Sequence, residues 1–282
     1  MTLGLRTQGM VWVACFLGCA LLLMSVATRA GAQRRPRRPP AVETVAGPPL
    51  EELVAQLASS DEAIIRQGIE ALGLRGQADI VEPLAARIRR GLPPELLELA
   101  VDTLVISGRP EAGPVLITLI SHRRPAIRLK AIMAVASLKP RGAEQSLTLA
   151  LSDADAQIRA AAATGLGQVG ARGSVDRLFL ALEHGVLEAS TSIGVLATPA
   201  EVVRLLGYLG RLAFDGISPA LGELLARRDI PDRTKLDIVA RLAELATGGA
   251  KTFLQEFVAS LPTTDRSPVR RAAEDAAMRI AD

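Results

Sequence analysis

Apolar residues recur along this chain with a period of about 31 residues, and the recurrence predicts a helical repeat. In each period, three apolar or small positions follow one another at intervals of four residues, which places them on one face of a helix. The three columns are Ile64, Leu96, Ile127 and Ile158; Gly68, Ala100, Ala131 and Ala162; and Leu72, Leu104, Val135 and Leu166. Another helix in each period carries Leu84, Leu116, Leu147 and Leu178, then Ile88, Ile120, Leu151 and Leu182. Each period is therefore predicted to be two amphipathic helices joined by short turns.

The string GLGQVG at residues 165–170 fits G-x-G-x-x-G, the glycine fingerprint of dinucleotide-binding folds. That fingerprint requires a strand before the glycines and a helix after them. Here the glycines follow IRAAAAT, which favours helix, so they lie at a helix end. We expect packing roles within the repeat, with Gly76, Gly108 and Gly170 as left-handed helix caps. The sequence does not predict a dinucleotide site.

The pattern resembles the HEAT-repeat family, and most closely its short bacterial form, which is also seen in phycobilisome-lyase-like proteins. The resemblance is carried by IRAAAATGLGQVGARGSVDRLFLALEHG at 158–185 and AIIRQGIEALGLRGQADIVEPLAARI at 63–88, with SPVRRAAEDAAMRIA at 267–281 as a terminal repeat helix. It implies an all-α fold, an α-solenoid of about seven HEAT-type helix pairs over residues 50–282. The register is disturbed near residues 185–229, where an irregular repeat is expected. HEAT motifs specify architecture and leave function open.

Residues 1–32 have the pattern of a secretory signal peptide. Arg6 precedes the uncharged run from Met10 to Ala27, and Ala30-Gly31-Ala32 predicts cleavage before Gln33. This indicates an exported protein, periplasmic or extracellular. One alternative is an uncleaved inner-membrane anchor, with the following arginines holding the body in the cytoplasm. Another is lipidation at Cys19, although the residues before it match a lipoprotein box poorly.

Residues 33–49, rich in arginine and proline, are predicted to be an extended linker. The sequence has 33 Lys and Arg against 30 Asp and Glu, but six of the arginines and none of the acidic residues lie in the first 38 positions. The body is therefore expected to be slightly acidic, which argues against nucleic acid as a partner. Signal cleavage would also remove both cysteines.

Charged residues follow the helices of the repeat. Acidic residues precede or open the second helix of a pair and basic residues lie near its end, as the helix dipole favours. Alternatively, one row of these cations lines an edge of the array and meets an acidic ligand. This candidate basic edge comprises Arg75, Arg109, Arg141 and Arg172.

The sequence offers no positive sign of catalysis. His122 and His184 lack the facing His-Glu pairs of metal-dependent HEAT-like hydroxylases, and no G-x-S-x-G string occurs. Phycobilisome-lyase relatives bind an open-chain tetrapyrrole, which calls for an aromatic-lined pocket; here it would lie between Phe179 and Phe214. Aromatic residues make up only 2% of the chain. We expect no enzyme activity, no metal and no cofactor.

One surface stripe departs from the charged pattern. The face of the second helix opposite the core carries Arg66 and Glu70, then Glu98 and Asp102, but becomes less polar in the next two repeats. The four residues of this candidate partner groove are Leu129, Met133, Ala160 and Thr164. The stripe either forms a groove for a peptide or packs against neighbouring helices.

Taken together, these features predict an exported, non-catalytic scaffold for protein–protein interaction, with an unidentified protein or peptide as its partner. The alternatives are a bilin-lyase-like enzyme that handles a ligand and a membrane-tethered cytoplasmic adaptor.

Overall fold

The computed structural model describes residues 48–75 and 78–281, which belong to the second of two units, Met1–Val45 and Ala46–Asp282. The predicted signal peptide and most of the predicted linker lie outside these residues. In the described ranges the chain forms fifteen α-helices and no β-strand, and none of these helices is long and apolar enough to cross a membrane. The helices are α1 (Leu50–Leu57), α2 (Glu62–Arg75), α3 (Val81–Arg90), α4 (Pro94–Ser107), α5 (Gly113–Leu119), α6 (Pro125–Leu138), α7 (Ala143–Ala150), α8 (Ala156–Val169), α9 (Val175–Glu183), α10 (Glu188–Leu196), α11 (Pro199–Leu206), α12 (Phe214–Ala226), α13 (Asp232–Leu245), α14 (Gly248–Ser260) and α15 (Pro268–Arg279).

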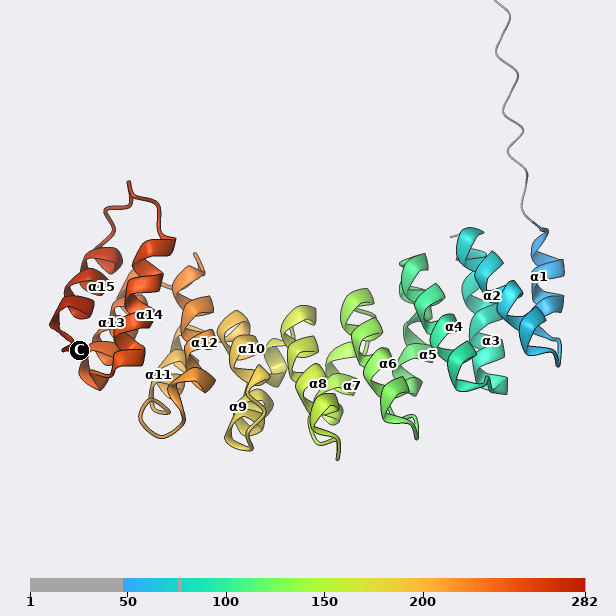
Figure 1. Cartoon of the computed structure of the whole chain (residues 1–282), viewed down its shortest axis with the longest axis horizontal. Coiled ribbons are helices and arrows are strands. Elements are labelled where there is room, and N and C mark those ends of the chain that lie inside the picture. Colours follow the sequence, from blue (N-terminus) through green and yellow to red (C-terminus); the bar gives the residue numbers. More distant parts are fainter. Residues whose placement is uncertain (1–47, 76–77, 282) are drawn as a thin grey trace, which may run out of the picture. The chain divides into compact units, whose positions relative to one another are not determined.

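Helices α1 to α10 form five consecutive pairs, each made of an odd-numbered helix and the even-numbered helix that follows it (Figure 1). The even-numbered helices from α2 to α12 pack side by side in one layer, whereas the odd-numbered helices α1 to α7 contact one another less extensively. From α11 onward the order is less regular, since α11 packs against α13 and α15 packs against both α13 and α14. This is the all-α solenoid that the sequence predicts.

The repeated apolar columns form the core. The column that contains Leu166 is fully buried in all four repeats, and so is the column that contains Leu84. The prediction for Ile64 is wrong, because its side chain is 39% exposed while Ile65 is 2% exposed. In the described residues no even-numbered helix precedes α2, so the face that bears Ile64 lacks the cover that its equivalents have.

The glycines of residues 165–170 have two different roles at the end of α8. A Cβ on Gly165 would lie 3.3 Å from the Cβ of Ala136, and one on Gly167 would lie 2.5 Å from the Oγ of Ser192, so both positions allow close helix packing. Gly170 has φ 75° and caps the helix in the left-handed conformation, as Gly108 does for α4 with φ 64°. Gly76 lies outside the described residues. These contacts confirm the packing and capping roles.

The irregular segment after α10 contains a tight turn and a contact that ties α12 back to α10. Residues 207–213 form a tight turn in which Leu209 and Leu212 make an isolated bridge. The sequence Phe214-Asp215-Gly216 has the composition of a break between helices, but it forms the first turn of α12. Arg227 follows α12 and donates hydrogen bonds to the carbonyl oxygens of Gly194 and Ala197, 2.9 and 2.8 Å away, which ties the end of α12 to the end of α10.

An ion pair joins the third repeat to the fourth. The Nη2 atom of Arg128 in α6 lies 2.8 Å from the Oδ1 atom of Asp153, in the turn before α8, and both side chains are only 15% exposed. Arg128 also donates to the carbonyl oxygen of His122 at 3.1 Å. The same Asp153 oxygen accepts a hydrogen bond from the backbone N–H of Asp155 at 2.9 Å. Asp153 therefore connects two repeats through charged hydrogen bonds.

We expect Asp153→Asn to lower the free energy of unfolding by about 1–3 kcal/mol at neutral pH, since the lost hydrogen bonds involve charged groups. Burial raises the pKa of Asp153, but the hydrogen bonds from Arg128 and from the Asp155 N–H, with the charges of Arg128 and Arg159, lower it more, so the pKa lies below its usual value. The contribution of Asp153 is therefore complete above the unfolded-state pKa of about 3.9 and is lost as the pH falls through the folded-state pKa.

Urea unfolding of the full chain at several pH values measures this effect. The matched control is Asp176→Asn, since Asp176 pairs with Arg204 at 2.7 Å but is largely exposed. The control should change stability little. A difference between wild type and Asp153→Asn that stays constant from neutral pH to below pH 4 would contradict the assignment.

Candidate functional site

The structure places Leu129 and Met133 beside an open hollow between α4 and α6. The hollow has a volume of about 420 Å³. Its lining is mostly aliphatic, with Asp102, Lys130 and Ser137 as its polar members. An apolar hollow of this size fits one or two aliphatic side chains of a partner.

The four residues of the predicted stripe have different surroundings. Met133 is 63% exposed, whereas Leu129 is half-buried and packs against the core. On α8, Ala160 is half-buried and Thr164 is exposed, and neither lines this hollow. The two sequence alternatives therefore each describe part of the stripe, because Leu129 contributes to packing while Met133 remains open to a partner.

The charges at the rim of the hollow are paired across the two helices. The Nζ atom of Lys130 on α6 lies 2.7 Å from the Oδ2 atom of Asp102 on α4 and 4.0 Å from the Oε2 atom of Glu98. Glu98 and Asp102 are the polar members of the same stripe in the preceding repeat. This pairing offsets part of the rim charge, so the apolar lining dominates what the hollow can bind.

The four arginines of the candidate basic edge also differ in their surroundings. Arg75, the last residue of α2, donates to the carbonyl oxygen of Pro48 at 3.1 Å and pairs with Asp79 at 3.4 Å. Arg109, Arg141 and Arg172 are exposed, and within the described residues their guanidinium groups make no hydrogen bond or ion pair. Arg75 therefore ties the residues just before α1 to the end of α2, whereas the side chains of the other three arginines face solvent.

The two histidines lie at equivalent positions, 62 residues apart, after α5 and α9. The Nδ1 atom of His122 accepts a hydrogen bond from the backbone N–H of Arg124 at 3.2 Å. His122 and His184 line separate hollows beside the exposed Leu149 of α7. No group of three or more His, Cys, Asp or Glu side chains in the described part of the chain is placed to hold a metal ion.

The aromatic residues from Phe179 to Phe214 pack against their neighbours. The rings of Phe179 and Tyr208 stack with centroids 5.9 Å apart, and the guanidinium of Arg204 lies 4.2 Å from the Phe179 centroid. Burial and the hydrogen bond to the Glu183 carboxylate raise the pKa of the Tyr208 hydroxyl above its usual value near 10. Phe214 makes an edge contact with Phe253. Phe179 and Tyr208 are both buried.

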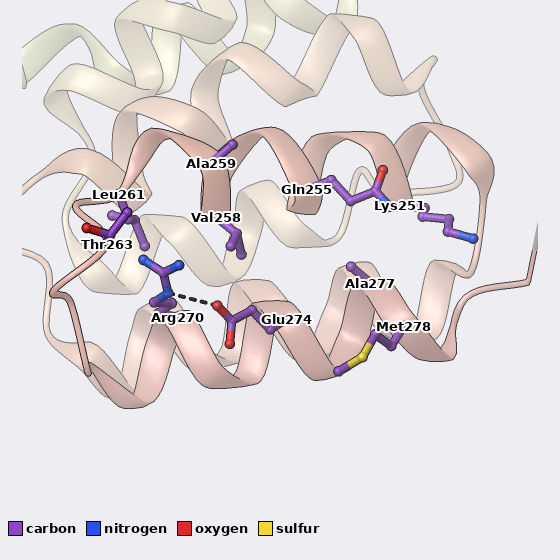
Figure 2. Close-up of a pocket in the computed structure, with 10 residues that line it drawn as sticks. All are labelled: Lys251, Gln255, Val258, Ala259, Leu261, Thr263, Arg270, Glu274, Ala277 and Met278. Atoms are coloured by element: carbon purple, nitrogen blue, oxygen red, sulfur yellow. Dashed lines mark hydrogen bonds and ion pairs between the residues drawn. The ribbon is translucent and has the colours of Figure 1, made fainter.

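A second apolar hollow, about 730 Å³ in volume, lies between α14 and α15 (Figure 2). Val258 of α14 points toward α15, whose Ala277 and exposed Met278 also line the hollow. Arg270 closes one end, where its Nε atom lies 2.8 Å from the Oε1 atom of Glu274. Sequence reasoning missed this hollow, although the large Met278 in an alanine-rich helix is a signal that could have indicated it.

These features define a repeat solenoid with open apolar hollows on its helix faces. Residues 113–189, from the start of α5 into α10, match the family model of HEAT repeats. A comparison with curated proteins by sequence gives no match.

Two solved structures of helical proteins are similar to this chain at low identity. The complex of CpcE and CpcF of phycocyanin lyase from Nostoc sp. PCC7120 is 18% identical, over 91% of this chain and 100% of that chain, with a TM-score of 0.45. A designed armadillo repeat protein in complex with the peptide (KR)4 is 16% identical, over 83% of this chain and 100% of that chain, with a TM-score of 0.40.

Proposed function

We propose that this protein is a non-catalytic interaction scaffold that is exported and binds a segment of another polypeptide in the hollow between α4 and α6. The observation that carries the proposal is Met133, which is 63% exposed at an apolar hollow in a layer of packed helices. A flexible thioether at such a position adapts to the side chains of a partner. Stacked repeats form an extended surface on which a peptide can contact several helices.

The openness of the hollow and its paired polar groups favour a polypeptide over a small molecule. Cofactor sites bury most of their ligand in clefts of about 300–1,000 Å³ with convergent polar groups. Here the hollow is open, and Lys130 pairs with Asp102 rather than presenting a free charge. An apolar side chain on a helical or extended segment matches these features.

The non-catalytic part of the proposal is supported by the aromatic residues. A tetrapyrrole-binding site would need rings that are accessible to a ligand, whereas Phe179 and Tyr208 are buried against each other. Export is proposed from the signal-like pattern of residues 1–32 alone.

We expect Met133→Glu to abolish partner binding while changing the free energy of unfolding by about 0.5 kcal/mol or less, because exposed positions tolerate substitution. A carboxylate at this position would oppose the apolar side chain of the partner. Leu129→Glu should cost more stability, since Leu129 is half-buried and packs against the core.

The measurement combines thermal unfolding with capture from cell-envelope extract on the immobilised full chain. The matched control is Leu74→Glu, which introduces the same charge at a 91% exposed leucine of α2 outside the hollow. Proteins retained by wild type and by Leu74→Glu, but not by Met133→Glu, would support the proposal. Equal retention by all three proteins would refute it, and so would the absence of any protein specifically retained by wild type.

A further inference from the structure

Three turns that follow α4, α6 and α8 lie against one another in series. A Cβ on Gly113, the first residue of α5 after the first turn, would clash with the Cβ of Pro140, in the second turn. The third turn contacts the second through Ser174, whose Oγ donates to the Oε1 atom of Glu144 at 2.9 Å. The three turns therefore form a continuous edge across three repeats.

This edge carries four exposed cations whose side chains make no hydrogen bond or ion pair in the described part of the chain, although the charge of Arg172 reaches Asp229. They form the cation row: Arg109, Lys139, Arg141 and Arg172. Three carboxylates lie near these cations: Glu111 in the first turn, Glu144 at the start of α7, and Asp229, which the charge of Arg172 reaches. Glu144 already accepts the hydrogen bond from Ser174. The cations thus outnumber the acidic groups, although the body as a whole carries more acidic than basic residues.

Lys139 stands at a position where glycine is less costly. It ends α6 with φ 48°, in the left-handed region, where Gly108 ends α4 and Gly170 ends α8. A non-glycine residue in this conformation costs free energy that glycine does not. Despite this cost, position 139 is a lysine, and its ammonium group lies between Arg109 and Arg172 in the row.

We propose that the cation row binds an extended acidic segment of a protein partner, with carboxylates at about every third residue. Neighbouring packed helices lie about 8–10 Å apart, so the cations of successive turns recur at that interval. An extended chain advances about 3.3 Å per residue, so three residues cover one repeat. The inference goes beyond the proposed function because the row lies at the turns rather than in the hollow between α4 and α6.

The surroundings of the row favour a peptide over a nucleic acid. Glu111 and Glu144 interrupt the positive charge, which would repel a continuous phosphate backbone but leaves room for spaced carboxylates. An adjoining hollow of about 820 Å³ is lined by the aliphatic side chains of Ile117 and Leu149 together with polar residues, among them Gln145. Binding of single-stranded nucleic acid uses aromatic side chains on which bases stack, and no aromatic residue lines this hollow.

The test is fluorescence anisotropy of the full chain with a labelled peptide of about 13 residues that carries glutamate at every third position, long enough to cross three repeats. The triple variant Arg109→Gln/Arg141→Gln/Arg172→Gln should weaken binding by about eightfold or more, since each exposed charge pair contributes about twofold to fivefold. The matched control removes three exposed arginines elsewhere, Arg66→Gln/Arg271→Gln/Arg279→Gln, and should change affinity less than twofold. All variants keep the arginines of residues 33–38, so any binding by that segment stays constant.

Lys139→Gly separates a binding role from a structural one. It should raise the melting temperature, because glycine relieves the left-handed strain. It should also weaken binding of the acidic peptide about twofold to fivefold, because one cation is lost. Unchanged peptide affinity in both the triple variant and Lys139→Gly would overturn the proposal. If a peptide with clustered glutamates binds as tightly as the peptide with glutamate at every third position, the proposed spacing is wrong. If an oligothymidine binds more tightly than the peptide through the same arginines, the ligand is a nucleic acid and not a peptide. If Met133→Glu loses the partner of the α4–α6 hollow but still binds the acidic peptide, the hollow and the cation row bind independently.

Discussion

Replacing Gly194 with alanine should destabilise the protein by about 2–3 kcal/mol, although alanine is the better helix former. Gly194 lies in α10 where that helix crosses α12, and a Cβ there would lie 2.6 Å from the carbonyl oxygen of Ala220 and 2.8 Å from its Cα atom. Both atoms belong to the backbone, so a side-chain rotation cannot remove the clash. The two helices would have to separate, and the apolar contacts between them would weaken.

Gly222→Ala is the matched control, because Gly222 lies inside α12 and a Cβ there would have a ring carbon of Phe253, 3.9 Å away, as its nearest neighbour. Here helix propensity should prevail, and the substitution should stabilise the protein by up to about 1 kcal/mol. Chemical unfolding of the two variants beside wild type decides the matter. Shifts of the same sign would show that α10 and α12 do not cross closely enough to exclude a methyl group at Gly194.

Truncating Phe179 to alanine should cost about 3–5 kcal/mol, the range for removing a fully buried aromatic ring. The ring stacks on Tyr208 and also contacts the guanidinium of Arg204, so its loss leaves a cavity and removes both interactions. Phe257→Ala, at a half-buried ring, should cost less.

This comparison also tests the alternative of a tetrapyrrole-handling enzyme. If an aromatic ring lines a ligand cavity, its truncation lowers the affinity of the protein for the ligand. Without ligand, the same truncation costs little stability. Thermal unfolding without ligand, combined with titration of an open-chain tetrapyrrole monitored by absorbance, separates the two roles. Phe179→Ala with near-normal stability and lost tetrapyrrole binding would favour the enzyme over the scaffold.

The surface chemistry depends on neighbours that sequence reasoning could not place. Arg75 and Arg109 occupy similar positions near helix ends, yet Arg75 contacts Pro48 and Asp79 while Arg109 faces solvent. Leu129 and Met133 lie one turn apart on α6, yet only Met133 remains largely exposed. In both cases the outcome is set by residues that are distant in the sequence or belong to another helix.

The sequence by itself determined the repeat, because helix formation and the burial of one helical face depend on spacings of three and four residues that the chain displays directly. The column of Leu166 and the caps at Gly108 and Gly170 follow from that local pattern. Tertiary structure alone decided the exposure of Ile64, the link from Arg128 to Asp153 and the hollow between α14 and α15. Each of these depends on how closely one helix approaches another, which is set by the fit of side chains across the interface rather than by the period of either helix.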